Sequence, residues 1–196
     1  MEKFLDWSLE LGVKQVSVWI GSTENLRSRS IREISELFKA YYAFLDRLEK
    51  RMPTLDKYQV KVRFVGDLNK LPKTMLKIMG RIMSATAKYQ RRMLNILVHY
   101  GGKFELVNVI KRIADKALRF GKVRITEKEV ERNLLLPTPV DLAIRTGGHT
   151  RLSNFMLWQA SYADIYYTKV LWPDFSRQHL LKAIKWFNSA QRNFGR

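Results

Sequence analysis

The segment MLNILVHYGG, residues 93–102, constrains the fold of this chain more than any other. Its first eight residues are almost continuously apolar, and a glycine pair then ends the run. A short apolar run bounded by glycine is typical of a strand that is buried on both faces of a parallel sheet. Because parallel strands are joined by crossover connections, usually helices, we expect helices on either side of it.

The rest of the chain alternates between helical and strand patterns. Helices are predicted at residues 2–11, 30–50, 72–88 and 103–119, from Thr126, from Ser153 and from Ser176 to about 191, and strands at 14–20, 58–65, 93–100, 141–145 and 163–168. This alternation predicts an α/β fold with a mostly parallel central sheet and helices on both faces. With 196 residues and no internal repeat or linker, the chain suits a single domain, residues 1–196.

The chain is strongly basic, with 36 lysines and arginines against 18 acidic residues and a formal net charge of +18. Such a charge attracts nucleic acids, anionic membranes or phosphorylated substrates, although a basic proteome would produce it too. The absence of cysteine excludes disulfides and thiolate sites. No apolar run is long enough to cross a membrane, and the acidic helical start MEKFLDWSLELG is unlike a signal peptide, so we expect a cytoplasmic location.

Three loops that are polar or contain glycine follow predicted strands, at residues 21–28, 100–103 and 145–153. In open α/β sheets, ligands bind in the crevice outside the carboxyl ends of the strands. The sequence therefore predicts a binding site built from these three loops.

The third loop belongs to the stretch RTGGHTRLSNF, in which Arg145 and Arg151 flank a glycine pair. Ser153 stands where the next helix is predicted to begin, and the free amide groups and dipole of a helix N-terminus favour an anion. Two guanidinium groups, a hydroxyl and a helix N-terminus suit a diphosphate. A surface turn with solvated arginines is the alternative that the spacing leaves open.

Common catalytic motifs do not offer a better interpretation. The chain contains no P-loop, no dinucleotide-binding glycine motif, no H-E-x-x-H and no G-x-S-x-G. Its three histidines, His99, His149 and His179, are spread along the chain. His149 could contact phosphate, although a loop histidine is more often exposed and idle, and His179 is predicted to be solvated.

Five segments together resemble the cis-prenyltransferases, the family of the undecaprenyl-diphosphate synthase type. The longest is DLAIRTGGHTRLSNFMLWQASYADIYYTKVLWPDF, residues 141–175, which resembles the C-terminal signature of that family over 35 residues. The others are GSTEN (21–25), VRFVGD (62–67), LNILVHYGG (94–102) and the closing QRNFG (191–195). The similarity covers nearly the whole chain and follows the order of the predicted strands.

This resemblance implies an enzyme that condenses isopentenyl diphosphate onto an allylic diphosphate with cis geometry and with Mg²⁺ as cofactor. The residues that match the site for isopentenyl diphosphate are Arg145, Arg151, Leu152 and Ser153. The residues that match the rest of the substrate site are Ser22, Thr23 and Glu24. The match implies that Asn25 assists removal of the proton and that Asp164 binds Mg²⁺.

The resemblance also implies partners. It implies a homodimer, or a heteromer with a homologue, and a peripheral membrane contact where a lipid product leaves. Nucleic acid is not the expected partner, because the basic stretch between Lys111 and Arg124 is explained equally well by a solvated helix face.

One departure from the family pattern is large. The family has a strand that ends in D-G-N-R-R, whose aspartate is the main Mg²⁺ ligand and whose loop holds the allylic diphosphate, and this chain has no such segment. Three explanations are open: a start placed too far downstream, a non-catalytic subunit that pairs with a full-length homologue, or a fragment with a changed function. The first is favoured, because the chain keeps Asn25, Arg145, Arg151, Ser153 and an acid at position 164.

The smaller departures are single residues. Asp164 and His149 each stand where the family commonly has glutamate. Leu26, His99 and Lys103 replace a tryptophan, an asparagine and an arginine, and the arginine expected after GSTEN is either Arg27 or Arg29.

Overall fold

The computed structural model describes residues 1–190, except for the side chains of residues 25–27. The predicted resemblance of QRNFG at 191–195 therefore lies outside the described residues.

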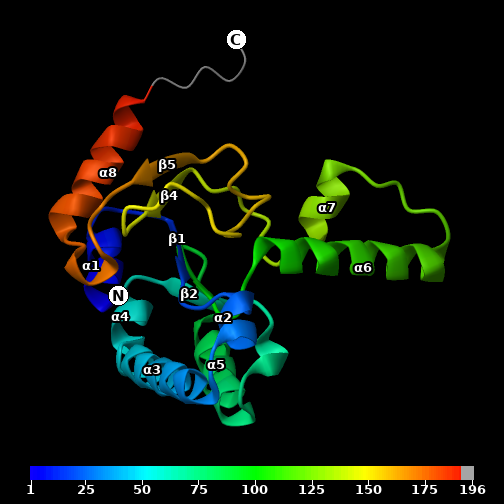
Figure 1. Cartoon of the computed structure of the whole chain (residues 1–196), viewed down its shortest axis with the longest axis horizontal. Helices are drawn as coiled ribbons and strands as arrows, with labels where there is room; N and C mark the ends of the chain where they lie inside the picture. Colours follow the sequence, from blue (N-terminus) through cyan, green and yellow to red (C-terminus); the bar gives the residue numbers. More distant parts are fainter. Residues whose placement is uncertain (191–196) are drawn as a thin grey trace.

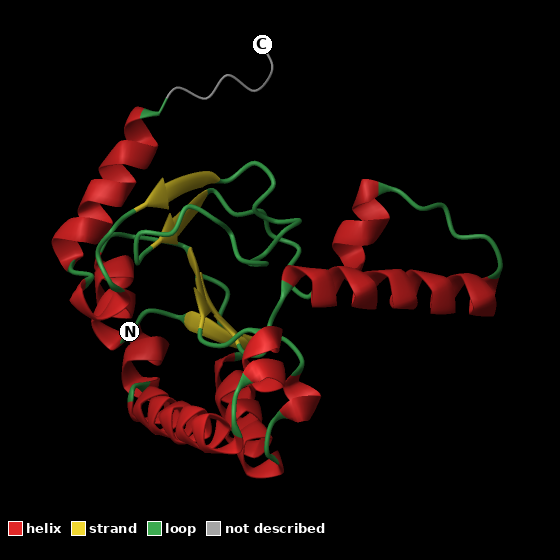
Figure 2. Cartoon of the chain, viewed as in Figure 1, coloured by secondary structure: helices red, strands yellow, loops and turns green. Residues whose placement is uncertain are grey.

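Within residues 1–190, parallel strands β1 to β5 form two sheets (Figures 1 and 2). Strands β1 (Gln15–Trp19), β3 (Arg92–Leu97) and β2 (Val60–Val65) form a three-stranded sheet in the order β1-β3-β2. Strands β4 (Leu142–Arg145) and β5 (Asp164–Tyr167) form a second sheet of two strands. The predicted α/β class and the parallel strands are confirmed, but the strands are divided between two sheets instead of forming one.

The helices lie outside the strands, and one pair projects away from them (Figure 1). Their bounds are α1 Glu2–Glu10, α2 Thr23–Ser28, α3 Ile31–Lys50, α4 Met52–Lys57, α5 Lys73–Thr86, α6 Gly102–Phe120, α7 Glu127–Asn133 and α8 Arg177–Ser189, with short 3₁₀ turns at Leu68–Lys70 and Trp172–Asp174. Helix α6 points out from the centre of the molecule and α7 folds back against it, whereas α8 lies beside α1 (Figure 1).

Two predicted elements were wrong. Residues 23–28 form helix α2 and not a polar loop, because a six-residue helix with a single apolar residue gives no periodic apolar signal. Residues from Ser153 onward form turns and not a helix. The φ angles of Ser153, Asn154 and Met156 are +50°, +68° and +39°, in the left-handed region, which interrupts the helical hydrogen-bond pattern.

The core follows the two-residue period of the strands. One face of the three-stranded sheet packs against α1, α3, α4 and α5, and its buried strand residues are Val18, Val60, Val62, Phe64, Leu94 and Ile96. The opposite face contributes Val65 and Leu97 to a second cluster with Tyr100, Leu136 and Met156. The fully buried Met156 comes from the segment predicted to be helical, so packing of this segment against the sheet decides its conformation.

Several predicted helix ends are confirmed. Ser30 caps α3 in a capping box, because its hydroxyl accepts from the amide of Glu33 and the Glu33 carboxylate accepts from the Ser30 amide. Thr126 accepts a hydrogen bond from the amide of Glu129 at the start of α7. Ile31, the first residue of α3, is 90% exposed.

Thr86 joins the end of α5 to the edge strand β2. Its hydroxyl accepts a hydrogen bond from the Val62 amide at 3.1 Å and donates to the Ile82 carbonyl at 2.8 Å. Thr86→Val keeps the shape of the side chain but leaves the buried Val62 amide without its acceptor. The variant is expected to lose about 1–3 kcal/mol of unfolding free energy in urea. Ser84→Ala, on an exposed position of the same helix, is the control; a loss no larger than that of the control would contradict the prediction.

None of the helices within the described residues is long and apolar enough to cross a bilayer.

Candidate functional site

Three loops meet beside the carboxyl ends of β1 and β3, and Asn154 lies where they meet. Its carbonyl accepts from the Gly102 amide at 2.7 Å, and its side-chain Oδ1 accepts from the Lys103 amide at 2.8 Å. Its Nδ2 donates to the Glu24 carboxylate at 3.0 Å. Residues 21–28 and 100–103 therefore meet as predicted, whereas the third loop reaches them only at its end, through Ser153 and the following residue, Asn154.

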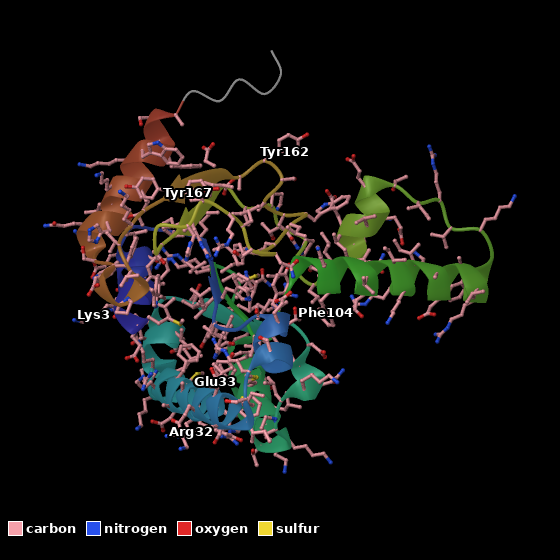
Figure 3. The ribbon with its side chains drawn as sticks, viewed as in Figure 1. Lys3, Arg32, Glu33, Phe104, Tyr162 and Tyr167 are labelled. Atoms are coloured by element: carbon pink, nitrogen blue, oxygen red, sulfur yellow. The ribbon has the colours of Figure 1, made fainter. Side chains whose placement is uncertain are left out.

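These loops surround an open pocket of about 490 Å³. The residues that line it are Trp19, Ser22, Glu24, Lys103, Ser153, Asn154 and Leu157. The Trp19 ring packs against Phe155 with centroids 5.5 Å apart, and its Nε1 donates to the Tyr100 carbonyl at 3.2 Å. One wall is therefore an apolar surface held in place, and the other carries an ammonium group, hydroxyls and one carboxylate. Figure 3 labels Phe104, which follows Lys103 in the first turn of α6.

Glu24 is held in its ionised form. Partial burial by itself would raise the pKa of its carboxyl. Hydrogen bonds from its own backbone amide and from the side chains of Ser22, Asn154 and Thr23 outweigh this effect, so the pKa lies below that of an ordinary glutamate. The bonds are thus complete at neutral pH and weaken only as the pH falls through this lowered pKa. Thr23 also attaches the segment 21–24 to the loop that follows β3, because its amide donates to the Tyr100 carbonyl at 3.3 Å.

The glycine turn after β4 has the predicted backbone. Gly147 and Gly148 have φ angles of +82° and +74°, which favour glycine. Their amides donate to the carbonyls of Val170 and Thr168, so the turn is attached to the chain that leaves β5. Its backbone amides are therefore partly occupied and are not all free for a ligand.

The two arginines lie on either side of this turn. Arg145 ends β4, and its Nε is buried without a hydrogen-bond partner among the described residues. Arg151 is exposed. Neither arginine lines the 490 Å³ pocket, whereas Ser153 does. The expected helix N-terminus at Ser153 is absent, since that residue starts a series of turns, and this part of the prediction was wrong.

The remaining predicted substrate residues are divided. Ser22 and Glu24 line the pocket, and Leu152 accepts a backbone hydrogen bond from Phe155 at 3.1 Å. Asn25 lies within α2 directly after Glu24, but its side chain lies outside the described residues.

Asp164 begins β5 and is the register partner of Leu142, three residues before Arg145 on β4. Asp164 and Arg145 are therefore offset by about 10 Å in the direction of the strands. Among the described side chains, no group of three histidine or acidic residues could hold a metal ion. Mg²⁺ commonly binds one or two carboxylates together with substrate phosphates and water. The donors present therefore fit an ion that a diphosphate shares with a single carboxylate, and they do not fit an ion caged by protein alone.

The three histidines lie in different environments. His99 is 1% exposed, and burial lowers the pKa of its imidazole even though nearby Asp67 acts in the opposite direction. His149 is exposed in the glycine loop, as predicted. His179 was predicted to be solvated, but its Nδ1 accepts from the Ser176 amide at 3.0 Å and caps α8.

Sequence reasoning missed a buried network directly behind the pocket. The Glu105 carboxylate accepts hydrogen bonds from the Tyr100 hydroxyl, the Gln159 amide and the backbone amides of Leu135 and Leu136. Nothing in the pattern of residues 103–119 distinguishes this glutamate from a solvated one. The roles of Asn154 and Lys103 in the pocket were missed for the same reason.

A second cavity lies at the other end of the strands. It is a void of about 30 Å³ among Leu5, Leu48, Leu55, Val60 and Leu94, large enough for about one water molecule. Its lining is mostly apolar, so the larger pocket, with its polar side chains, is the candidate functional site.

Comparisons with known proteins indicate the family of this chain. A family model described as putative undecaprenyl diphosphate synthase matches residues 1–195. An isoprenyl transferase of Chlamydia trachomatis is 39% identical over 199 residues, covering 99% of this chain and 77% of that protein. A tritrans,polycis-undecaprenyl-diphosphate synthase of Methanocaldococcus jannaschii, described as specific for geranylgeranyl diphosphate, is 34% identical and covers 100% and 71%, respectively.

Solved structures are similar over the whole chain. A probable undecaprenyl diphosphate synthase from Campylobacter jejuni matches with a TM-score of 0.87 and 31% identity, over 100% of this chain and 90% of that one. Lavandulyl diphosphate synthase from Lavandula x intermedia, in complex with dimethylallyl diphosphate, matches with a TM-score of 0.91 and 28% identity, over 100% and 84%. The fold and these relatives define a prenyltransferase. The chain belongs to the cis-prenyltransferase family, of the undecaprenyl diphosphate synthase type.

Proposed function

We propose that this protein condenses isopentenyl diphosphate onto an allylic diphosphate in a Mg²⁺-dependent reaction that makes a cis-polyprenyl diphosphate. The observation that carries the proposal is the pocket in which Lys103, Ser22, Ser153 and the ionised Glu24 meet beside the apolar wall of Trp19 and Leu157. A diphosphate with an apolar tail needs both kinds of wall. The net charge of +18 favours the approach of such anionic substrates.

Each predicted residue has a role in this proposal. Arg145, Arg151 and Ser153, with Leu152 between them, bind the diphosphate of isopentenyl diphosphate, and guanidinium groups suit that ligand because they donate paired hydrogen bonds. Ser22, Thr23 and Glu24 line the remaining substrate site, Asn25 assists removal of the proton, and Asp164 is the carboxylate offered to Mg²⁺. When bound, Mg²⁺ would neutralise charge on the leaving diphosphate.

The partners follow from the same proposal. The protein works as a homodimer in the cytoplasm and touches the membrane surface peripherally, where an apolar product can leave. Basic side chains at that surface would be attracted to anionic lipids.

A direct assay tests the proposal. The protein is incubated with labelled isopentenyl diphosphate, Mg²⁺ and, in separate reactions, dimethylallyl, geranyl, farnesyl or geranylgeranyl diphosphate. Labelled polyprenyl product that extracts into butanol is expected with at least one primer, and chelation of Mg²⁺ by EDTA should abolish it. Failure with every primer, in the presence of Mg²⁺, would contradict catalysis by this chain alone.

The second candidate is a non-catalytic subunit of a two-chain prenyltransferase. One observation favours it: within residues 1–190, β1 pairs only with β3 and β4 only with β5. An unpaired strand edge is a place where another strand can add. Product formed only after a catalytically competent homologue is added would support this role, and product from the chain alone would exclude it.

A further inference from the structure

Asn154 connects Lys103 and Glu24 on the polar side of the pocket and has no role in the proposed function so far. It contacts residues that are distant in the sequence, Lys103 from the start of α6 and Glu24 from the start of α2. Its side-chain amide is used in both senses, since Oδ1 accepts from Lys103 and Nδ2 donates to Glu24. Aspartate could only accept at both positions while ionised, and leucine, of similar size, could do neither.

Asn154 caps helix α6 from outside the helix. The N-cap residue of α6 is Gly101, which has no side chain with which to satisfy the first amides. The Gly102 amide donates to the Asn154 carbonyl and the Lys103 amide donates to its Oδ1. The backbone of Lys103 is thus fixed by Asn154 at the rim of the pocket.

The local backbone is built for this contact. Asn154 has a φ of +68°, a conformation in which asparagine is favoured among residues with a side chain. A Cβ atom at Gly101 would lie 2.7 Å from both Asn154 Nδ2 and Thr23 Oγ1. A side chain at position 101 would therefore force the Asn154 and Thr23 side chains to move.

We propose that Asn154 is a positioning residue that sets the relative placement of Lys103 and Glu24 and thereby shapes the diphosphate pocket. This inference rests on the proposed function for its consequence in catalysis, but its structural part stands independently. The Glu24 carboxylate is kept on the wall by the donated hydrogen bond. Asn25, the proposed participant in proton removal, follows it in the same helix.

Two variants separate the two halves of the amide. Asn154→Ala removes the two side-chain hydrogen bonds, to Lys103 and to Glu24. Faster hydrogen exchange of the Lys103 amide is expected, and an NMR titration should show a rise in the pKa of Glu24. Asn154→Asp keeps the acceptor for Lys103 but places a second carboxylate against Glu24. The two acids must then share a proton, so their apparent pKa values separate.

The kinetic measurement is the kcat/KM of each variant divided by that of the wild type, determined at a series of pH values. For Asn154→Asp, the ratio of kcat/KM for isopentenyl diphosphate should be highest in acid, where a shared proton restores the bond to Glu24. It should fall by about tenfold as the pH rises through the upper apparent pKa of the pair, the loss expected for one hydrogen bond to a charged group. For Asn154→Ala the same ratio of kcat/KM should be low at every pH and should vary less with pH than the ratio for Asn154→Asp.

Matched controls come from α6, the helix that Asn154 caps. Asn108 lies on α6, where its Nδ2 donates to the Phe104 carbonyl at 2.9 Å, and it does not line the pocket. Asn108→Ala and Asn108→Asp should leave the pKa of Glu24, Lys103 exchange and the pH ratio unchanged. A merely structural role of Asn154 would instead lower activity equally at every pH, in step with the thermal midpoint, and this result would overturn the proposal.

The measurements also separate this inference from the proposed function. If the wild-type protein makes no product, the NMR titration and amide exchange still decide the matter. Pyrophosphate binding by calorimetry then replaces the kinetic readout, with weaker binding expected for both Asn154 variants. An unchanged pKa of Glu24 and unchanged Lys103 exchange in Asn154→Ala would refute the positioning role, whatever the activity.

Discussion

Replacing Arg145 with alanine is expected to raise the KM for isopentenyl diphosphate by roughly 10- to 100-fold, with a smaller effect on kcat. This follows if the guanidinium supplies one charge-assisted hydrogen bond to the diphosphate, worth about 1.5–3 kcal/mol, since each 1.4 kcal/mol is about tenfold in affinity. Arg145 ends β4, and its buried Nε has no partner among the described residues. Because that nitrogen makes no bond within the described protein, alanine should leave the stability nearly unchanged.

Steady-state kinetics with varied isopentenyl diphosphate measure this effect. Arg145→Lys keeps the charge but lacks the planar fork and should recover only part of the affinity. The control is Arg177→Ala. This variant removes an exposed arginine of α8 that pairs with Glu10 of α1, and it should change neither KM nor kcat. If KM and kcat of Arg145→Ala both equal those of the wild type, the proposed role of Arg145 is wrong.

Replacing Glu105 with alanine should produce the largest loss of stability predicted for this chain, about 3–5 kcal/mol. Glu105 is 1% exposed, and its carboxylate accepts from Tyr100, Gln159 and two backbone amides of the loop before β4. Alanine would leave these buried donors without an acceptor and would also open a cavity. The network connects α6 to the turns that carry Asn154, so the pocket should be disturbed as well.

Urea unfolding followed by circular dichroism measures the loss. Glu36→Ala is the matched control, because Glu36 forms an exposed pair with Lys39 on α3 and its removal should cost less than about 0.5 kcal/mol. If Glu105→Ala cannot be purified folded, Tyr100→Phe removes one donor and should cost about 1–2 kcal/mol. A loss below about 1 kcal/mol for Glu105→Ala would show that the network contributes little.

Much of the fold could be predicted from local patterns. The alternation at residues 14–20 and 58–65 predicted β1 and β2, because successive side chains of a strand point to opposite faces. The continuous apolar run at 93–100 predicted β3, because a strand buried on both faces is apolar throughout. The amphipathic pattern of 30–50 predicted α3 for the corresponding reason. Residues 153–163 have a helix-like composition but form turns, since three left-handed residues and the burial of Met156 outweigh local propensity.

The candidate site was predictable in part. The S-T-E-N and R-T-G-G stretches indicated which loops to examine, and Ser22, Glu24 and Ser153 do line the pocket. The patterns did not single out Lys103 within the predicted loop 100–103, or Asn154 just beyond the third loop, because nothing local distinguishes these polar side chains from solvated ones. The functional roles of Arg145, Arg151, Leu152, Asn25 and Asp164 remain predictions.

By itself, the sequence determined the helices and strands with strong periodicity, the parallel α/β class and the loops that could bind an anion. These properties depend on residues close together in the chain, whose spacing decides which side chains share a face. Only the tertiary structure decided that Asn154 bonds to Lys103, 51 residues away, and to Glu24, 130 residues away, and that Glu105 is buried beneath them. Such contacts depend on how whole elements pack, because a polar side chain is equally compatible with solvent or a partner until packing removes the water.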